Sequence, residues 1–107
     1  MSHTERYQRI LSATDIMDVE IETDQGRVIG FSLNLRARIG EEWREVKRYD
    51  TRHGRLHVHR FWLPEEARIQ WLEEEGDEAT TDYARELREA EEELKRNWEI
   101  HRKRLRG

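Results

Sequence analysis

The chain has 107 residues, of which 35% are hydrophobic and 41% are charged, and it contains no cysteine. This length predicts a single domain, and the lack of cysteine excludes disulfide bridges and thiolate metal sites. The formal net charge of −4 argues against a general polyanion binder. No apolar run reaches transmembrane length and the N-terminus lacks the features of a signal peptide, so we expect a cytoplasmic protein that does not enter a membrane.

Residues 1–39 predict a short helix followed by two strands. Residues 1–11 can form the helix, with Tyr7 and its neighbours Ile10 and Leu11 as apolar contacts. Residues 17–22 then alternate between apolar and acidic side chains, which is the period of a half-buried strand. A turn follows at residues 24–26, and the alternation returns over residues 31–39.

Residues 42–51 and 55–62 predict a third and a fourth strand, joined by a tight turn at His53-Gly54. The third strand is irregular, because parity puts Trp43 and Tyr49 on one face and Val46 on the other, and a bulge would resolve this conflict. The fourth strand carries Leu56, Val58 and Trp62 on one face and His57, His59 and Phe61 on the other. Four consecutive strands with short turns predict an antiparallel meander over about residues 15–62.

The period changes to that of helices after Leu63. Pro64 stands at a first helical position before two acids, which predicts a short helix over residues 64–75. A long amphipathic helix is predicted over residues 81–106, with its acids early and its bases late. We therefore expect residues 1–107 to form one α+β domain, a four-stranded antiparallel meander packed against the short helix and the long C-terminal helix.

The long helix is also a candidate surface for a partner. At about 37 Å it would exceed the width of a four-stranded sheet. Its end is then expected to project, or to pair with a second copy of the chain as a homodimer.

The candidate site lies between the third and fourth strands. Parity puts Arg48 and Asp50 on one face of the third strand, and His57 and His59 on one face of the fourth. With the turn at residues 53–54, Asp50 lies opposite His57 and Arg48 opposite His59, with Cβ atoms about 5 Å apart. A register shift of two residues would keep all four on one face. Strand order decides whether this surface also includes Asp18, Glu20, Glu22, Arg36 and Arg38.

Such a group can cleave a phosphodiester bond without a metal or any other cofactor. One imidazole, with an unperturbed pKa of about 6.5, takes the proton of the 2′-hydroxyl group and another protonates the leaving oxygen. An arginine stabilises the charge that develops on the phosphate, and an aspartate orients a histidine. The candidate catalytic residues are Arg48, Asp50, His53, His57 and His59.

Two other interpretations of the same residues remain open. One is an ordinary polar outer face of a sheet with a cross-strand Asp-His pair. The other is a metal site, because His57 and His59 project together and Asp50 or His53 can complete a three-ligand set. No fourth ligand follows from the sequence.

The residues of this segment also resemble a known family. Arg48-Tyr49-Asp50, then His53-Gly54, then His57-x-His59 resembles the R-[YW]-D…H…H-x-H core of TumE-like proteins, which are small prokaryotic toxins of toxin–antitoxin pairs. The resemblance implies a growth-inhibiting activity such as RNA cleavage, an antitoxin partner, and functional roles for these five charged or histidine positions. TumE-like proteins usually have Asn after the Asp, where this chain has Thr51.

The sequence therefore favours a small cytoplasmic protein that acts on RNA through its His/Asp/Arg sheet face. The alternative is a non-catalytic interaction or dimerisation protein whose long helix binds a partner chain, and a metal-dependent hydrolase or metal-binding module comes third. Residues 73–93 carry eleven acids, which would repel RNA phosphates unless the long helix lies on the opposite side of the sheet.

Overall fold

The chain folds into one antiparallel sheet and one long helix. A computed structural model describes residues 1–77 and 79–106, with His53 described by its backbone alone. The six strands follow one another in the sheet in the order of the sequence, so the sheet is a simple meander. The elements are β1 (Ser2–Ser12), β2 (Asp15–Asp24), β3 (Arg27–Ile39), β4 (Glu42–Asp50), β5 (His57–Arg60), β6 (Ile69–Trp71) and α1 (Tyr83–Arg106), with single 3-10 turns at Arg52–Gly54 and Glu65–Ala67.

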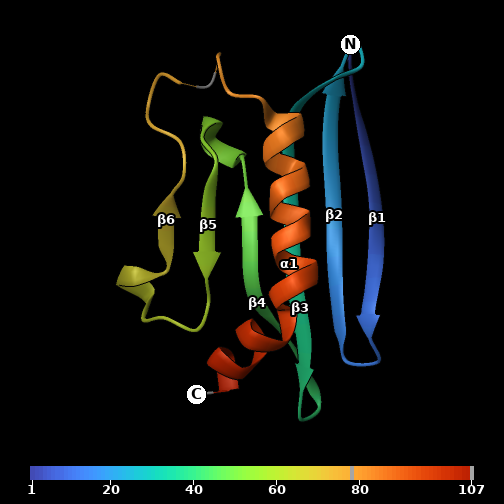
Figure 1. The fold of residues 1–107 in the computed structure, drawn as a ribbon, viewed down its shortest axis with the longest axis vertical. Coiled ribbons are helices and arrows are strands. Elements are labelled where there is room, and N and C mark those ends of the chain that lie inside the picture. The colour runs from blue at the N-terminus through green and yellow to red at the C-terminus, as the bar shows by residue number, and fades with distance from the viewer. Residues whose placement is uncertain (78, 107) are drawn as a thin grey trace.

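The helix covers one face of the sheet and leaves the other face open. In Figure 1, α1 runs along the strands in front of β3 and β4. The alternate residues of the central strands that face the helix are fully buried, as is Leu94 on the helix side of the core. The core therefore lies in one layer between α1 and the sheet, built from Met17, Val19, Phe31, Leu33, Leu35, Ala37, Val46, Leu56, Tyr83, Ala90 and Leu94. The predicted α+β class is confirmed.

The prediction of a helix over residues 1–11 is wrong, because this segment forms strand β1. It pairs with β2 along nearly its whole length, from Ser2 opposite Asp24 to Ile10 opposite Ile16. The long open edge of β2 offers a row of unpaired backbone groups, and hydrogen bonding to that edge outweighs the weak local helix pattern.

The prediction of a short helix over residues 64–75 is also wrong. Only one 3-10 turn forms, at Glu65–Ala67, with Pro64 just before it, and strand β6 follows. β6 pairs with the free edge of β5, with Trp71 opposite His57 and Ile69 opposite His59. The helix would have had few apolar side chains to bury, whereas the strand satisfies the backbone of β5. With β1 and β6, the meander has six strands and not four.

The bulge that the sequence required in β4 is present at Val46. The register between β3 and β4 shifts between Leu35 and Arg36, which lie opposite Lys47 and Glu45. The extra residue turns Val46 toward the helix, where it is fully buried. As a result Val46 and Tyr49 share the helix face, and Trp43 lies on the open face against the guanidinium of Arg36.

The end of α1 is held against the sheet and does not project. The ring of His101 is buried and stacks on Trp62 with their centroids 5.2 Å apart. Arg102 forms an ion pair of 3.2 Å with the buried carboxylate of Asp15 at the start of β2. Because α1 runs along the strands, the 13-residue strand β3 gives the helix a surface to cover along its length. Within residues 1–77 and 79–106, no helix is long and apolar enough to cross a membrane.

Candidate active site on the open face of the sheet

The predicted pairing of the site residues is confirmed. In the register of β4 and β5, Asp50 lies opposite His57 and Arg48 lies opposite His59. Their side chains are on the open face, because the intervening residues Tyr49 and Val58 pack on the helix side. We call Arg48, Asp50, His57 and His59 the histidine face.

Strand order extends this polar surface across the sheet. Asp18 of β2 lies opposite Asn34 of β3, which lies opposite Arg48 of β4. Glu20 likewise lies opposite Ser32, which lies opposite Asp50. Arg36 is on the same face, since its Nε lies 2.6 Å from Asp18 Oδ2. The open face is therefore basic and imidazole-rich near β5 but acidic near β2.

His57 is held with one ring nitrogen available for chemistry. Its side chain is only 3% exposed, and its Nδ1 lies 2.8 Å from the carbonyl oxygen of Arg55. Because a carbonyl oxygen can only accept, Nδ1 must carry the proton in this bond. A neutral His57 thus keeps its lone pair on Nε2, which makes that atom a base or a metal ligand.

Asp50 is a buried carboxylate next to two arginines. Its side chain accepts the backbone N–H of Arg52 at 2.7 Å, and its other oxygen lies 3.6 Å from Nε of Arg48. Arg48 is itself oriented by Glu45, which accepts a hydrogen bond of 2.6 Å from its guanidinium. The carboxylate is therefore fixed at the C-terminal end of β4, directly across from His57.

His59 favours its neutral form. Burial lowers the pKa of His59, and the positive charge of Arg48 lowers it further, as does the neighbouring His57. The ring of His59 lies edge to face against the ring of His57, with centroids 4.9 Å apart. The neutral imidazole has a free lone pair that can accept a proton, and the cation beside it makes it a weaker base than a free imidazole.

The two histidines lie in a row of four aromatic rings. Trp71 of β6 lies 4.9 Å from His57, and Phe61, after β5, stacks on His59 at 5.7 Å. We call Trp71, His57, His59 and Phe61 the aromatic row. The place of Trp71 in this row does not follow from the sequence, which predicts a helix over residues 64–75. The β-prone run Ile69-Gln70-Trp71 was the signal that could have found it.

Each end of the aromatic row carries arginine side chains. The guanidinium carbon of Arg55 lies 4.0 Å over the ring of Trp71. Arg48 and Arg68 lie 5.6 Å and 5.9 Å from the centre of Phe61. Cation–π contacts of this kind hold the guanidinium groups at the surface of the row without neutralising them.

Three residues of the site can also hold a metal ion. Asp50, His57 and His59 each offer one ligand atom, and these atoms lie within 4.8 Å of one another. Two imidazoles and a carboxylate suit zinc and related ions, and the hydrogen bond from His57 Nδ1 to a carbonyl group is typical of a metal-ligating histidine. The positive charge of Arg48, 3.6 Å from Asp50, opposes a cation at this position.

His53 is the one predicted site residue that the geometry does not address. Its side chain lies outside the described part of the structure. Its backbone belongs to the 3-10 turn Arg52–Gly54, which connects β4 to β5. Gly54 closes that turn with a φ of +83°, a conformation that favours glycine.

Thr51, where TumE-like proteins usually have Asn, ties the end of β4 to β3. Its hydroxyl oxygen accepts the backbone N–H of Phe31 at 3.0 Å. A Cβ atom at Gly30 would lie 2.9 Å from the same hydroxyl oxygen, so only glycine allows this approach. Thr51 thus fixes the strand end that carries Asp50.

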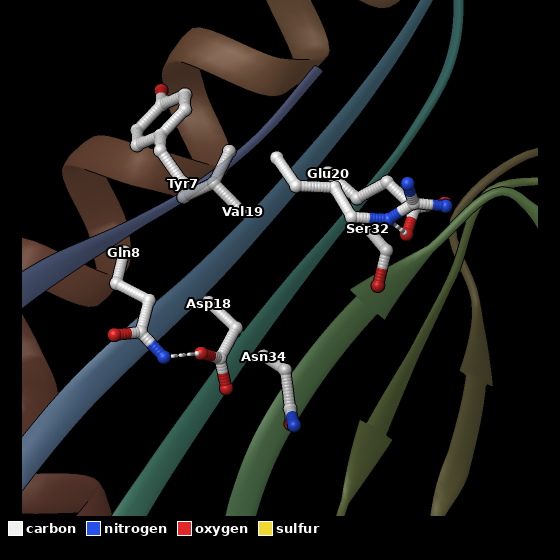
Figure 2. Close-up of a pocket in the computed structure, with 8 residues that line it drawn as sticks. Tyr7, Gln8, Asp18, Val19, Glu20, Ser32 and Asn34 are labelled. Atoms are coloured by element: carbon white, nitrogen blue, oxygen red, sulfur yellow. Dashed lines mark hydrogen bonds and ion pairs between the residues drawn. The ribbon is translucent and has the colours of Figure 1, made fainter. Parts of the chain in front are cut away.

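Two hollows lie on the open face beside the histidine face. One is lined by Arg6, Tyr7, Gln8, Asp18, Val19, Glu20, Ser32 and Asn34, and Figure 2 shows Gln8, Asp18 and Asn34 directed away from the helix and Tyr7 toward it. Gln8 donates a hydrogen bond of 2.9 Å to Asp18 there. The second hollow borders Asp50 itself, between Ser32 and Arg52. Both hollows are lined by more acids than bases, with Glu20, Glu22 and Asp50 against Arg52 in the second, so neither favours an anionic ligand.

Comparison with known proteins gives one match. A family described as "Domain of unknown function (DUF7718)" matches residues 1–106. Comparison with curated proteins and with solved structures gives no match. The family match covers nearly the whole chain, including every residue of the histidine face. The chain therefore belongs to the DUF7718 family of domains of unknown function.

Proposed function

We propose that this chain is a cytoplasmic, toxin-like ribonuclease that cleaves RNA without a metal, and that the histidine face is its active site. One observation carries the proposal: two imidazoles face a buried carboxylate and an arginine across one strand pair. This set contains a base, an acid, a group that orients the acid and a group that stabilises anionic charge.

The roles follow from the surroundings of each histidine. His59 is the base, because burial and Arg48 hold its pKa below the usual value and keep it neutral. His57 is the acid, because the carboxylate of Asp50 lies opposite it and can orient its ring toward the leaving oxygen. Arg48 donates to the non-bridging phosphate oxygens as negative charge develops on them.

The reaction is an internal transfer at phosphorus. His59 takes the proton of the 2′-hydroxyl group while the 2′-oxygen attacks the adjacent phosphorus atom. The bond from phosphorus to the 5′-oxygen breaks, and that oxygen takes its proton from His57. The products are a 2′,3′-cyclic phosphate and a 5′-hydroxyl group, and the two histidines have exchanged protonation states.

The position of the helix supports this function. The acids of α1 lie on the helix face of the sheet, where Glu91 and Glu93 contact Tyr7, Tyr49 and Lys47. The sheet thus separates the acidic helix from the histidine face. An RNA strand on the open face near β5 meets Arg48, Arg52 and Arg55 and is separated by the sheet from the acids of α1.

Cleavage of labelled RNA by the purified protein, in the presence of a chelator, tests the proposal. We expect a 2′,3′-cyclic phosphate product, and we expect His57→Ala and His59→Ala each to lower the rate by about 10²- to 10⁴-fold. His3→Ala is the matched control, because His3 is exposed on β1 and outside the site. The absence of cleavage by wild-type protein would refute the proposal, and cleavage that needs an added metal would refute its metal-free form.

Expression in bacteria gives a second, independent test. The toxin-like role predicts growth arrest by the wild-type chain, relieved by His57→Ala or His59→Ala at equal protein levels. It also predicts that a separate antitoxin protein relieves the arrest. Normal growth with abundant folded wild-type protein would count against a toxin.

The alternative of a partner-binding helix receives less support. The apolar stripe of α1 packs against the chain's own sheet, where Tyr83, Ala90 and Leu94 are buried. A homodimer through this stripe would require the helix to leave the core.

A further inference from the structure

The aromatic row points to the form of RNA that this site accepts. We propose that Trp71 and Phe61 bind bases on either side of the cleaved bond, so that the substrate is unpaired RNA. The inference rests on the proposed function, because the two histidines at the centre of the row are the proposed acid and base. It adds a binding site at β6 and at the end of β5.

The order of the rings fits a nucleotide step. The row runs from Trp71 through His57 and His59 to Phe61, with neighbouring ring centroids 4.9, 4.9 and 5.7 Å apart. The reacting phosphate must lie at the two central rings, which are the imidazoles. The bases that flank this phosphate then lie toward the two outer rings, Trp71 on one side and Phe61 on the other.

The exposure of Trp71 and the positive charge beside it indicate a binding site for a nucleotide base and not a part of the hydrophobic core. Trp71 is 48% exposed on the short edge strand β6, although tryptophan is usually well buried. Arg55 lies 4.0 Å over its ring. Bases stack on arginine planes as well as on aromatic rings, so a base can extend the stack that Arg55 begins.

The Phe61 end combines a ring with two cations. Arg48 and Arg68 lie within 6 Å of the Phe61 centroid, at 5.6 and 5.9 Å. Arg68 is fixed by a hydrogen bond of 2.8 Å from its Nε to the carbonyl oxygen of Leu63. A base against Phe61 therefore lies beside guanidinium groups that can contact its phosphate.

Stacking at both ends excludes a regular duplex. In double-stranded RNA the bases are paired and stacked on each other, and the deep major groove does not admit side chains. Only an unpaired strand can splay its bases onto Trp71 and Phe61 while its backbone passes the histidines. Stacking tolerates any base, so we expect little sequence preference.

Binding of a fluorescent 2′-O-methyl oligonucleotide measures this site without cleavage, because the attacking hydroxyl group is absent. We expect fluorescence anisotropy to show that Trp71→Ala and Phe61→Ala weaken binding about tenfold each. Trp71→Phe keeps an aromatic ring and should retain most of the affinity. Trp43→Ala is the matched control, because Trp43 is 41% exposed on the open face and contacts Arg36 but lies outside the row.

The result separates this inference from the proposed function. If Trp71→Ala binds the oligonucleotide as tightly as wild type, or if a duplex competes as well as the single strand, the inference is overturned. If RNA is still cleaved in that case, the proposed function stands alone. If binding depends on Trp71 and Phe61 but no RNA is cleaved, the base-binding site is supported and the proposed ribonuclease function is refuted. Circular dichroism of each variant confirms that the protein is still folded.

Discussion

At the scale of single residues, the site depends on alternation along two neighbouring strands. Arg48 and Asp50 differ by two positions, as do His57 and His59, so parity alone puts each pair on one face. The short turn between β4 and β5 then brings the pairs together in the predicted register. These four positions could be predicted because both the alternation and the turn are local in sequence.

Two other features of the site could not be predicted from the sequence. The bond from His57 Nδ1 to the carbonyl oxygen of Arg55 depends on a ring rotation that no periodicity encodes. The contact between His57 and Trp71 depends on β6, whose pairing with β5 is decided by the free edge of that strand. Sequence patterns do not show which edges of a sheet remain free.

The neutral state of His59 gives a prediction at this scale. Burial is the largest cause of its lowered pKa, and Arg48 is the next. Removing that positive charge with Arg48→Gln should raise the pKa of His59 toward the usual value of about 6.5. NMR titration of the His59 ring protons measures the midpoint directly, without reference to activity.

Arg44→Gln provides the control for this titration. Arg44 is exposed on the same strand but lies opposite Ala37, on the helix face. The His59 midpoint should therefore not move in Arg44→Gln. An unchanged midpoint in Arg48→Gln would mean that Arg48 does not contribute to the lowered pKa of His59.

At the scale of elements, α1 is anchored to the sheet by the carboxylate of Glu93. Lys47 donates to it at 2.6 Å and Tyr49 donates at 2.8 Å, both from β4. His101 and Asn97 contact its other oxygen from the next turns of the helix. The carboxylate thus joins the bulged strand to both the middle and the end of α1.

This anchor predicts a pH-dependent stability. Burial alone would raise the pKa of Glu93, but hydrogen bonds from His101, Lys47 and Tyr49 outweigh it and hold the pKa below its usual range. A lowered folded-state pKa stabilises the fold above the unfolded-state pKa of about 4.3, and this contribution is lost as the pH falls below that value. Glu93→Gln should cost about 2–4 kcal/mol at pH 7.

Urea denaturation at pH 7, 4 and 3 measures this contribution. The difference in unfolding free energy between wild type and Glu93→Gln should shrink as the pH falls below 4.3. Glu92→Gln is the control, because its exposed side chain should change stability by less than about 0.5 kcal/mol. An equal difference at all three pH values would contradict a role for the ionised carboxylate.

The elements themselves were predicted unevenly. Strands β2 and β3 and the long helix have strong periodic patterns and could be predicted, as could the irregular β4 and the short β5. The edge strands β1 and β6 were assigned to helices, because a few apolar residues at spacings of three and four fit either structure. The free edges of neighbouring strands, and not the local sequence pattern, decide whether such segments form strands or helices.

At the scale of the whole molecule, the single layer of core makes the helix indispensable. Leu94 is fully buried between α1 and the sheet. We therefore expect Leu94→Glu to cost about 3–5 kcal/mol of stability, because it buries a carboxylate without a partner. Urea denaturation, together with light scattering at several protein concentrations, separates this loss of stability from a change of oligomeric state.

Ile100→Glu is the matched change at an exposed position of the same helix. The side chain of Ile100 is 50% exposed, so its replacement should be nearly neutral. If Leu94→Glu keeps normal stability but changes the molecular mass, the partner-binding helix becomes the better account of α1.

The open face of the sheet has a consequence for how the domain can change. Nearly every strand residue serves either the core or the polar surface, because neighbouring side chains point to opposite faces. Substitutions of open-face side chains, such as those of the histidine face and the aromatic row, therefore leave the packing against α1 in place. An experimenter can therefore exchange the groups on this surface one at a time to transplant a different activity onto the same scaffold.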